Sequence, residues 1–226
     1  MFVTAFKNTG NCFICGKTIG KAAGKTYVIK EHGKNGTEEC TLIKVEGAYD
    51  KDYWLFVDIP MNESLGDLDF FLREIWLECC GHMSMFSKGK HRNGTFTELE
   101  QDLKINYFSI GNVLDYKYDM GDTTRLIISF VGKTRREEQK AAVRLLLRNA
   151  PFTFPCVACK EQAVYACGYC SCVKDDYCYC AKCGKEHEND CDGRMFTIPN
   201  SPRFGQCAYD GTQDIHIFNP FAKSNC

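Results

Sequence analysis

Residues 53–60 read YWLFVDIP, and residues 64–81 read SLGDLDFFLREIWLECCG. In an extended chain, alternate residues of the first stretch point to opposite faces. One face would carry Tyr53, Leu55, Val57 and Ile59, and the other Trp54 and Phe56. Because both faces are apolar, the stretch predicts a strand that is covered on both sides. Pro60 would end it.

The second stretch predicts a helix. Ser64 and Asp67 have the spacing of a capping box, in which each side chain bonds the other residue's backbone N–H. Apolar residues recur at helical spacing after this cap, at Leu65, Leu68, Leu72, Ile75, Trp76 and Cys79. Gly81 would stop the helix. Cys79 is therefore expected to pack as a small apolar residue.

Other segments supply further elements. Short strands are expected at residues 26–29, 41–45, 103–108, 114–118 and 125–131. Between the last two, Asp119, Gly121 and Asp122 suit a tight turn. A second helix is expected over residues 134–149, because Thr134 and Glu137 again have capping-box spacing. Together these elements predict an α+β fold with a mixed or antiparallel sheet and one or two packed helices, flanked by small zinc-binding modules.

The overall composition is that of an ordinary globular protein. The chain has 226 residues, of which 44% are hydrophobic and 25% are charged, with a formal net charge of -1. No apolar run reaches the roughly 18 residues of a membrane span, and the first residues lack an apolar signal core. We therefore expect a soluble, cytoplasmic protein that does not associate with membranes.

Cysteine is the unusual component, with 16 residues, nine of them between positions 156 and 191. Disulfide frameworks occur mostly in short exported chains, whereas Cys-x2-Cys pairs bring two thiolates to one zinc ion. Zinc is thus the favoured interpretation, and disulfides are the alternative. The expected ligands form four pairs: Cys156 and Cys159, Cys167 and Cys170, Cys180 and Cys183, and His187 and Cys191.

Eight ligands suffice for two closed tetrahedral sites, which are structural rather than catalytic. The close spacing of the pairs favours an interleaved arrangement. One site would then use Cys156, Cys159, Cys180 and Cys183, and the other Cys167, Cys170, His187 and Cys191. Cys178 could replace Cys180, and Cys172 is spare.

A third zinc site is expected in the N-terminal segment. Cys12 and Cys15 form a further Cys-x2-Cys pair, and His32 and Cys40 would complete it. A thioredoxin-like redox pair is the alternative, but it needs a strand before and a helix after the pair. The chain then divides into a zinc-knuckle-like segment (1–50), an α+β core (51–150) and a two-zinc finger module with a tail (151–226).

Two resemblances bear on the function. The cysteine spacing from residue 156 to 191 resembles a MYND-type finger, which implies a protein-binding surface. The segments YWLFVDIP and DYKYDMGDTTRLIISF, with the leucine-rich helix between them, resemble the plasmid pRiA4b ORF-3-like family, with Met120 in place of a phenylalanine. The flanking pieces IWLECCGHMSMF, LLLRNAPFTFPCVAC and NSPRFGQCAYDG look like an uncharacterised zinc-bearing subgroup of it. The family implies an α+β fold and carries no established activity or catalytic residues.

The sequence favours a non-enzymatic, zinc-stabilised binding or adaptor protein with a protein partner. Six acidic residues against four lysines between residues 156 and 191 oppose binding to phosphate backbones. Tyr169, Tyr177 and Tyr179 would be exposed anchors.

Two other classes of function stay open. A nucleic-acid-associated accessory protein would use a basic stripe on the second helix, formed by Arg136, Lys140, Arg144 and Arg148. An enzyme would use a cleft lined by Glu78, Cys80, His82 and Asp119.

Overall fold

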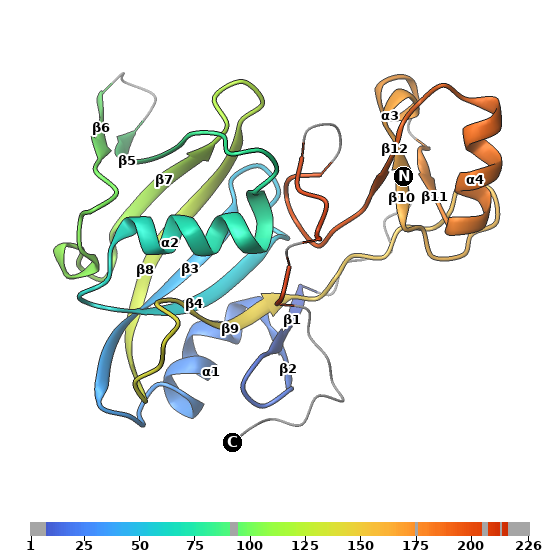
Figure 1. Ribbon diagram of the computed structural model, residues 1–226. Coiled ribbons are helices and arrows are strands. Elements are labelled where there is room, and N and C mark those ends of the chain that lie inside the picture. The colour runs from blue at the N-terminus through green and yellow to red at the C-terminus, as the bar shows by residue number, and fades with distance from the viewer. Residues whose placement is uncertain (1–7, 91–94, 175, 205–207, 213, 217–226) are drawn as a thin grey trace.

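A computed structural model describes residues 8–90, 95–174, 176–204, 208–212 and 214–216. Figure 1 shows a large twisted sheet with helices against it, and a small cysteine-rich module to one side. The architecture is α+β, and every strand pair described in both sheets is antiparallel. The predicted fold class is therefore confirmed, with the sheet antiparallel rather than mixed.

The large sheet has nine strands. In spatial order they are β2 (Thr18–Gly20), β1 (Thr9–Cys12), β9 (Arg144–Asn149), β4 (Trp54–Pro60), β3 (Glu38–Gly47), β8 (Thr124–Arg136), β7 (Val113–Tyr118), β5 (Ser84–Lys90) and β6 (Thr95–Leu99). The helical elements beside this sheet are η1 (Lys21–Ala23), α1 (Gly24–Glu31), α2 (Leu65–Leu72), the π-helical turn η2 (Arg73–Leu77) and η4 (Ile105–Tyr107).

The predicted two-sided strand is β4, and all of its residues are buried. Leu55, Val57 and Ile59 belong to a core that also contains the apolar residues of α2 and η2. Trp54 and Phe56 face a second core with Val28 of α1. The sheet is thus covered by α2 on one face and by α1 on the other, as the two apolar faces of β4 predicted (Figure 1).

The predicted capping box begins α2. The hydroxyl of Ser64 accepts a hydrogen bond from the Asp67 backbone N–H at 3.2 Å, and the Asp67 carboxylate accepts one from the Ser64 N–H at 2.8 Å. The helix ends earlier than expected. It passes into the turn η2, and Glu78 is already extended. Gly81, with φ +81°, therefore lies in a loop beyond the helix rather than at its end.

The predicted helix over residues 134–149 is wrong. These residues complete β8 and, after a connection, form β9, which lies between β1 and β4. The run Leu145–Leu147 is buried on both faces of the sheet, and this burial outweighs the helical spacing of the apolar residues.

Two shorter strand predictions are also wrong. Residues 26–29 lie in α1, because Gly24 lets the helix approach the Phe56 ring and Val28 enters the second core. Residues 103–108 form a loop with η4 rather than a strand. The predicted strands at 41–45, 114–118 and 125–131 lie within β3, β7 and β8, and Asp119 adopts φ +63° in the predicted turn.

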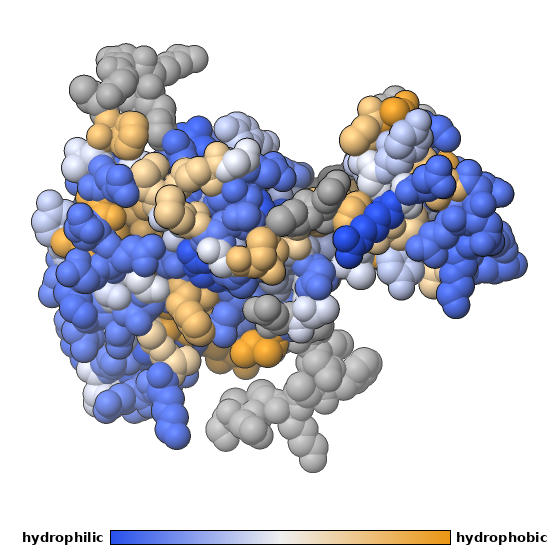
Figure 2. Space-filling model, turned by 45° about the horizontal axis from the view of Figure 1, so that its top comes forward, coloured by the Kyte–Doolittle hydropathy of each residue, from blue (hydrophilic) through white to orange (hydrophobic). Residues whose placement is uncertain are grey.

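The cysteine-rich module follows β9. We call residues 156–197 the finger. Its three-stranded sheet has the order β11 (Cys178–Tyr179), β10 (Tyr165–Cys167), β12 (Met195–Thr197), and it carries α3 (Gly168–Val173) and α4 (Ala181–Asp190). Figure 2 shows the finger as a lobe joined to the core by a narrow neck. After the finger the chain returns to the core, where Ser201 Oγ donates to the Trp76 carbonyl at 2.7 Å.

The predicted boundary at residue 50 does not coincide with a structural boundary, because β1, β2 and β3 belong to the same sheet as β4. Within the described part of the chain, no helix combines the length and the apolar character needed to cross a membrane.

Candidate metal centres

The finger brings together two sets of four ligand residues. In the first cluster the ligand atoms of Cys156, Cys159, Cys180 and Cys183 lie within 4.8 Å of one another, and in the second those of Cys167, Cys170, His187 and Cys191 do. These are the two sets that the interleaved pairing predicts. Cys178 is buried in β11, Cys172 is exposed on α3, and neither belongs to a cluster.

The helix starts of the finger position its cysteine pairs. Cys167 is the N-cap of α3, and its sulfur accepts the Cys170 backbone N–H at 3.5 Å. Cys180 is the N-cap of α4 in the same way, with the Cys183 N–H at 3.4 Å. A Cys-x2-Cys pair at a helix start thus aims both sulfurs at one point while the free N–H groups of the first turn face them.

Helix α4 joins the two clusters. Its first turn supplies Cys180 and Cys183 to the first cluster, and His187 and Cys191, at its other end, reach the second. The Tyr179 ring stacks on the His187 imidazole, with centroids 4.2 Å apart and planes 16° apart. This stacking fixes the orientation of the imidazole.

The distances between the sulfur atoms are those of ligands around one ion rather than those of disulfides. The sulfurs of Cys159 and Cys180 are 3.6 Å apart, and those of Cys167 and Cys191 are 3.8 Å apart. A disulfide bond is only about 2.05 Å long. In the second cluster, Cys170 Sγ lies 3.4 Å from His187 Nε2. Each cluster therefore surrounds a common centre, as ligands of one metal ion do, and the clusters could form zinc modules.

Backbone N–H groups favour the thiolate form of Cys156 and of Cys167, one sulfur in each finger cluster. Burial opposes ionisation of Cys156, but the backbone N–H groups of Cys180, Cys159 and Ala158 outweigh it and lower the pKa of Cys156 to about 6. Burial also opposes ionisation of Cys167, and there the N–H of Cys170 lowers the pKa. Since the thiolate is the metal-binding form, these donors prepare the sulfurs for a cation.

A third cluster lies at the N-terminal end of the sheet and unites Cys12, Cys15 and His32. Cys12 ends β1, and Cys15 follows in a turn closed by the Gly16 N–H on the Cys12 carbonyl. His32 caps the C-terminus of α1, with its Nε2 3.4 Å from Cys12 Sγ. The Tyr27 hydroxyl lies 2.7 Å from Cys15 Sγ.

Cys40, the predicted fourth ligand, does not join this cluster. It is fully buried in β3, where its sulfur points to the Glu38 carbonyl at 3.8 Å. Burial, and then the nearby Asp58 carboxylate, raise the pKa of Cys40 to about 12. The register of β3 between β4 and β8 places this thiol away from Cys12 and Cys15, and sequence spacing could not reveal that register.

A fourth group, Cys79, Cys80 and His82, was not expected to hold a metal. The sequence interpretation placed Cys79 in the core; the residue is only partly buried, against the core that contains α2. The available signal was the pattern Cys-Cys-x-His, in which two thiols and an imidazole lie within four residues. The residues of the proposed enzymatic cleft do meet here, since Cys80 Sγ and Asp119 Oδ2 both lie near His82 Nε2, at 3.1 and 3.4 Å.

The predicted basic stripe does not form, since its helix is absent. Arg136 and Arg148 are buried, Arg144 pairs with the buried Asp58, and Lys140 is exposed on the connection between β8 and β9. Two of the four cations are therefore structural groups inside the protein.

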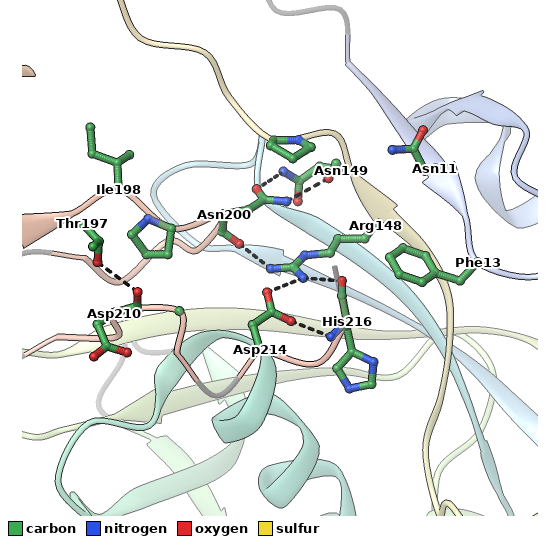
Figure 3. A pocket seen from close by; sticks show the side chains of 13 residues that line it. Asn11, Phe13, Arg148, Asn149, Thr197, Ile198, Asn200, Asp210, Asp214 and His216 are labelled. Carbon is green, nitrogen blue, oxygen red and sulfur yellow. Dashed lines mark hydrogen bonds and ion pairs between the residues drawn. The ribbon is translucent and has the colours of Figure 1, made fainter. Parts of the chain in front are cut away.

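A cavity of about 320 Å³ lies where the returning tail meets the sheet (Figure 3). Arg148 donates there to the Asp214 carboxylate at 2.6 Å and to the Asn200 carbonyl at 2.8 Å. Asn149 and Asn200 bond each other through two hydrogen bonds, at 2.7 and 3.0 Å. These polar groups largely bond one another, so they anchor the tail, and with it the finger, to β9.

The three tyrosines of the finger differ in exposure. Tyr169 is 62% exposed on α3, whereas Tyr179 is only 8% exposed and packs on His187. Tyr177 is partly buried against the small cluster that Tyr179 forms with the buried cysteines of the finger. Only Tyr169 is thus the exposed anchor that was expected; Val173, one helical turn further on, is exposed as well.

Comparison with known structures found a likeness, in fold alone, to a protein of unknown function. No protein-family model matches the chain, and no curated protein matches it. The chain is similar to the crystal structure of a protein of unknown function, MM3350 from Methanosarcina mazei Go1. That likeness has 19% sequence identity and a TM-score of 0.40, and it covers 49% of this chain and 68% of that one. The resemblance to the plasmid pRiA4b ORF-3-like family stays a prediction.

Proposed function

We propose that this protein is a non-enzymatic, zinc-stabilised binding protein whose finger docks onto a protein partner. The observation that carries the proposal is the pair of complete four-ligand clusters in a module that projects from the core. Four protein ligands close a tetrahedral site, so the ions hold the finger together and have no vacant position for a substrate.

Zinc is the ion that suits these ligands. Ligand sulfurs about 2.3 Å from a tetrahedral ion are about 3.8 Å from one another. The separations of 3.6 and 3.8 Å in the two clusters fit that geometry. Four thiolates, or three thiolates with an imidazole, are donor sets typical of structural zinc.

A protein partner suits the surface of the finger better than a nucleic acid does. Acidic residues outnumber lysines between the first and last ligands, which opposes the release of counterions from phosphates. Tyr169 and Val173 lie four positions apart on α3, so they share one face of that helix, and both are more than half exposed. Tyrosine is enriched among the side chains that contribute most of the binding free energy in protein interfaces.

The test uses the full-length, zinc-loaded protein immobilised as bait in extract of its native host. We expect a double variant, Tyr169→Ser with Val173→Ser, to lose specific protein partners while keeping its zinc content. The matched control, Tyr107→Ser with Ile110→Ser, removes exposed apolar side chains from the surface of the large-sheet domain. It should keep the same partners.

Retention of the same partners by the finger variant would contradict the proposal. Recovery of nucleic acid alone, in amounts that fall steeply with salt, would favour the accessory-protein alternative instead.

A further inference from the structure

We propose that Cys79, Cys80 and His82 form an additional zinc site in the core, separate from the finger and from the N-terminal cluster. Their ligand atoms lie within 4.8 Å of one another. The sulfurs of Cys79 and Cys80 are 3.6 Å apart, and Cys80 Sγ is 3.1 Å from His82 Nε2. Two thiolates and an imidazole are a donor set that zinc uses in proteins, and such soft ligands select against Mg²⁺ and Ca²⁺.

The loop that carries these ligands is shaped before any ion arrives. Oε1 of Glu78 accepts the backbone N–H groups of Cys79 and Gly81, at 3.0 and 2.5 Å. The same carboxylate is held by Arg73 at 2.9 Å and by the Tyr118 hydroxyl at 3.2 Å. Gly81 has φ +81°, a conformation that glycine adopts without strain, and this bend turns His82 back towards Cys80. A preformed loop reduces the entropy lost on metal binding.

The geometry does not suit a nucleophilic Cys–His–Asp relay. Such a relay needs one imidazole nitrogen facing the thiol and the other facing the carboxylate. Here Cys80 Sγ and Asp119 Oδ2 both approach the same atom, Nε2 of His82. Thiol, imidazole and carboxylate atoms that converge on one region are instead the arrangement expected around a cation.

A disulfide between the adjacent cysteines does not describe this arrangement either. The separation of 3.6 Å is far longer than the sulfur–sulfur bond of about 2.05 Å, but it is close to the edge of a thiolate tetrahedron around zinc.

The ligands lie beside a buried guanidinium and can be reached by an ion from solvent. The Arg203 guanidinium lies 3.8 Å from Cys79 Sγ and 2.8 Å from Asp119 Oδ2. Cys80 is exposed and His82 is partly exposed, so the ligands can be reached from solvent.

The location gives the site a structural consequence. Arg203 belongs to the chain that returns from the finger, whereas Asp119 belongs to the turn after β7. An ion on Cys79 and Cys80 would therefore lie beside the contacts that Arg203 of the tail makes with Cys79 and Asp119.

The test measures zinc per chain in the full-length protein, loaded with Zn²⁺ under reducing conditions and then desalted. We expect Cys80→Ser and His82→Ala each to bind one zinc fewer than the wild type, with an unchanged far-ultraviolet circular dichroism spectrum. Cys172→Ser, which changes an exposed cysteine outside every cluster, is the matched control and should bind as much zinc as the wild type.

A second readout uses Co²⁺ in place of zinc. The thiolate-to-cobalt absorption should lose the same fraction in both variants and keep its full intensity in the control. Equal zinc content in wild type and variants would overturn the proposal. So would a Cys79–Cys80 disulfide in the peptide map of the protein as isolated. Because the site lies outside the finger, neither result depends on whether the finger binds a protein.

Discussion

Asp58 shows how one buried carboxylate organises the charges of the sheet. It is fully buried in β4, and Arg144 of β9 contacts both of its oxygens. The Thr134 hydroxyl donates to it at 3.2 Å, and Arg136 Nη1 lies 3.7 Å away. Arg136 and Arg144, which the sequence placed in an exposed basic stripe, are thus partners of an anion inside the protein.

Replacing this carboxylate should destabilise the core strongly. Asp58→Asn removes the buried anion that Arg144 contacts through both oxygens, whereas Arg136 keeps Glu38 at 2.7 Å; breaking a buried ion pair costs about 3–5 kcal/mol. Urea unfolding of the zinc-loaded protein, followed by tryptophan fluorescence, measures this cost, because both tryptophans are buried in the core. Glu39→Gln, which breaks the exposed pair with Arg135, is the control and should cost less than about 1 kcal/mol. Similar losses for both variants would contradict the prediction.

Variants at Cys40 and His32 test which residues bind metal in the N-terminal cluster. Because Cys40 is buried away from the cluster, Cys40→Ala should leave the zinc content unchanged. His32→Ala removes a ligand and should lower the zinc content by one ion per chain. Elemental analysis of the purified variants decides this, and a loss of zinc in Cys40→Ala would restore the four-ligand site predicted from the sequence.

At the scale of single elements, hydrogen bonds between residues three positions apart position three helix starts. Ser64 and Asp67 begin α2, while Cys167 and Cys180 begin α3 and α4 with sulfur in place of oxygen. In each case the side chain accepts an N–H that the helix itself cannot satisfy. The same type of side-chain cap therefore positions a packed helix in the core and metal ligands in the finger.

Removing the cap of α2 should weaken the core by a moderate amount. Ser64→Ala deletes the acceptor of the Asp67 N–H, a change that typically costs about 0.5–2 kcal/mol. Tryptophan fluorescence during urea unfolding again gives the value. Thr97→Ala, on the exposed edge strand β6, should change stability by less than about 0.5 kcal/mol. A cap variant as stable as this control would show that the capping box contributes nothing.

At the scale of the whole molecule, the core and the finger depend on different forces. The core has two clusters of large apolar residues around the sheet. The buried residues of the finger's hydrophobic cluster are three cysteines and Tyr179. Little apolar surface is therefore available to stabilise the finger without metal. Structural zinc supplies on the order of 10 kcal/mol of binding free energy to such small modules.

Chelation should accordingly unfold the finger before the core. With a strong chelator under reducing conditions, we expect limited proteolysis to cleave within residues 156–197 while tryptophan fluorescence stays native. Cys159→Ser and Cys183→Ser should show the same cleavage without chelator, and Cys172→Ser should resist it. A finger that stays protected after its metal has been removed would contradict this account.

The sequence by itself determined the features that depend on local chemistry. Apolar residues at consecutive positions predicted that β4 is covered on both faces, and the spacing of Ser64 and Asp67 predicted the start of α2. Cys-x2-Cys spacing grouped the ligands of the finger. Each of these depends on periodicity or on contacts between residues a few positions apart.

Only the tertiary structure decided the conformation of segments whose local sequence pattern is compatible with both a helix and a strand. Residues 144–149 have helical spacing, yet they form β9 because β1 and β4 offer hydrogen-bond partners on both sides. Residues 26–29 resemble a strand, yet α1 docks where Gly24 fits against Phe56. Cys40 is separated from its expected site by strand register, and Arg136 meets Asp58 across the sheet. Contacts with residues that are distant in sequence supply the free energy that selects these conformations. Short-range sequence patterns do not reveal which distant residues will make those contacts.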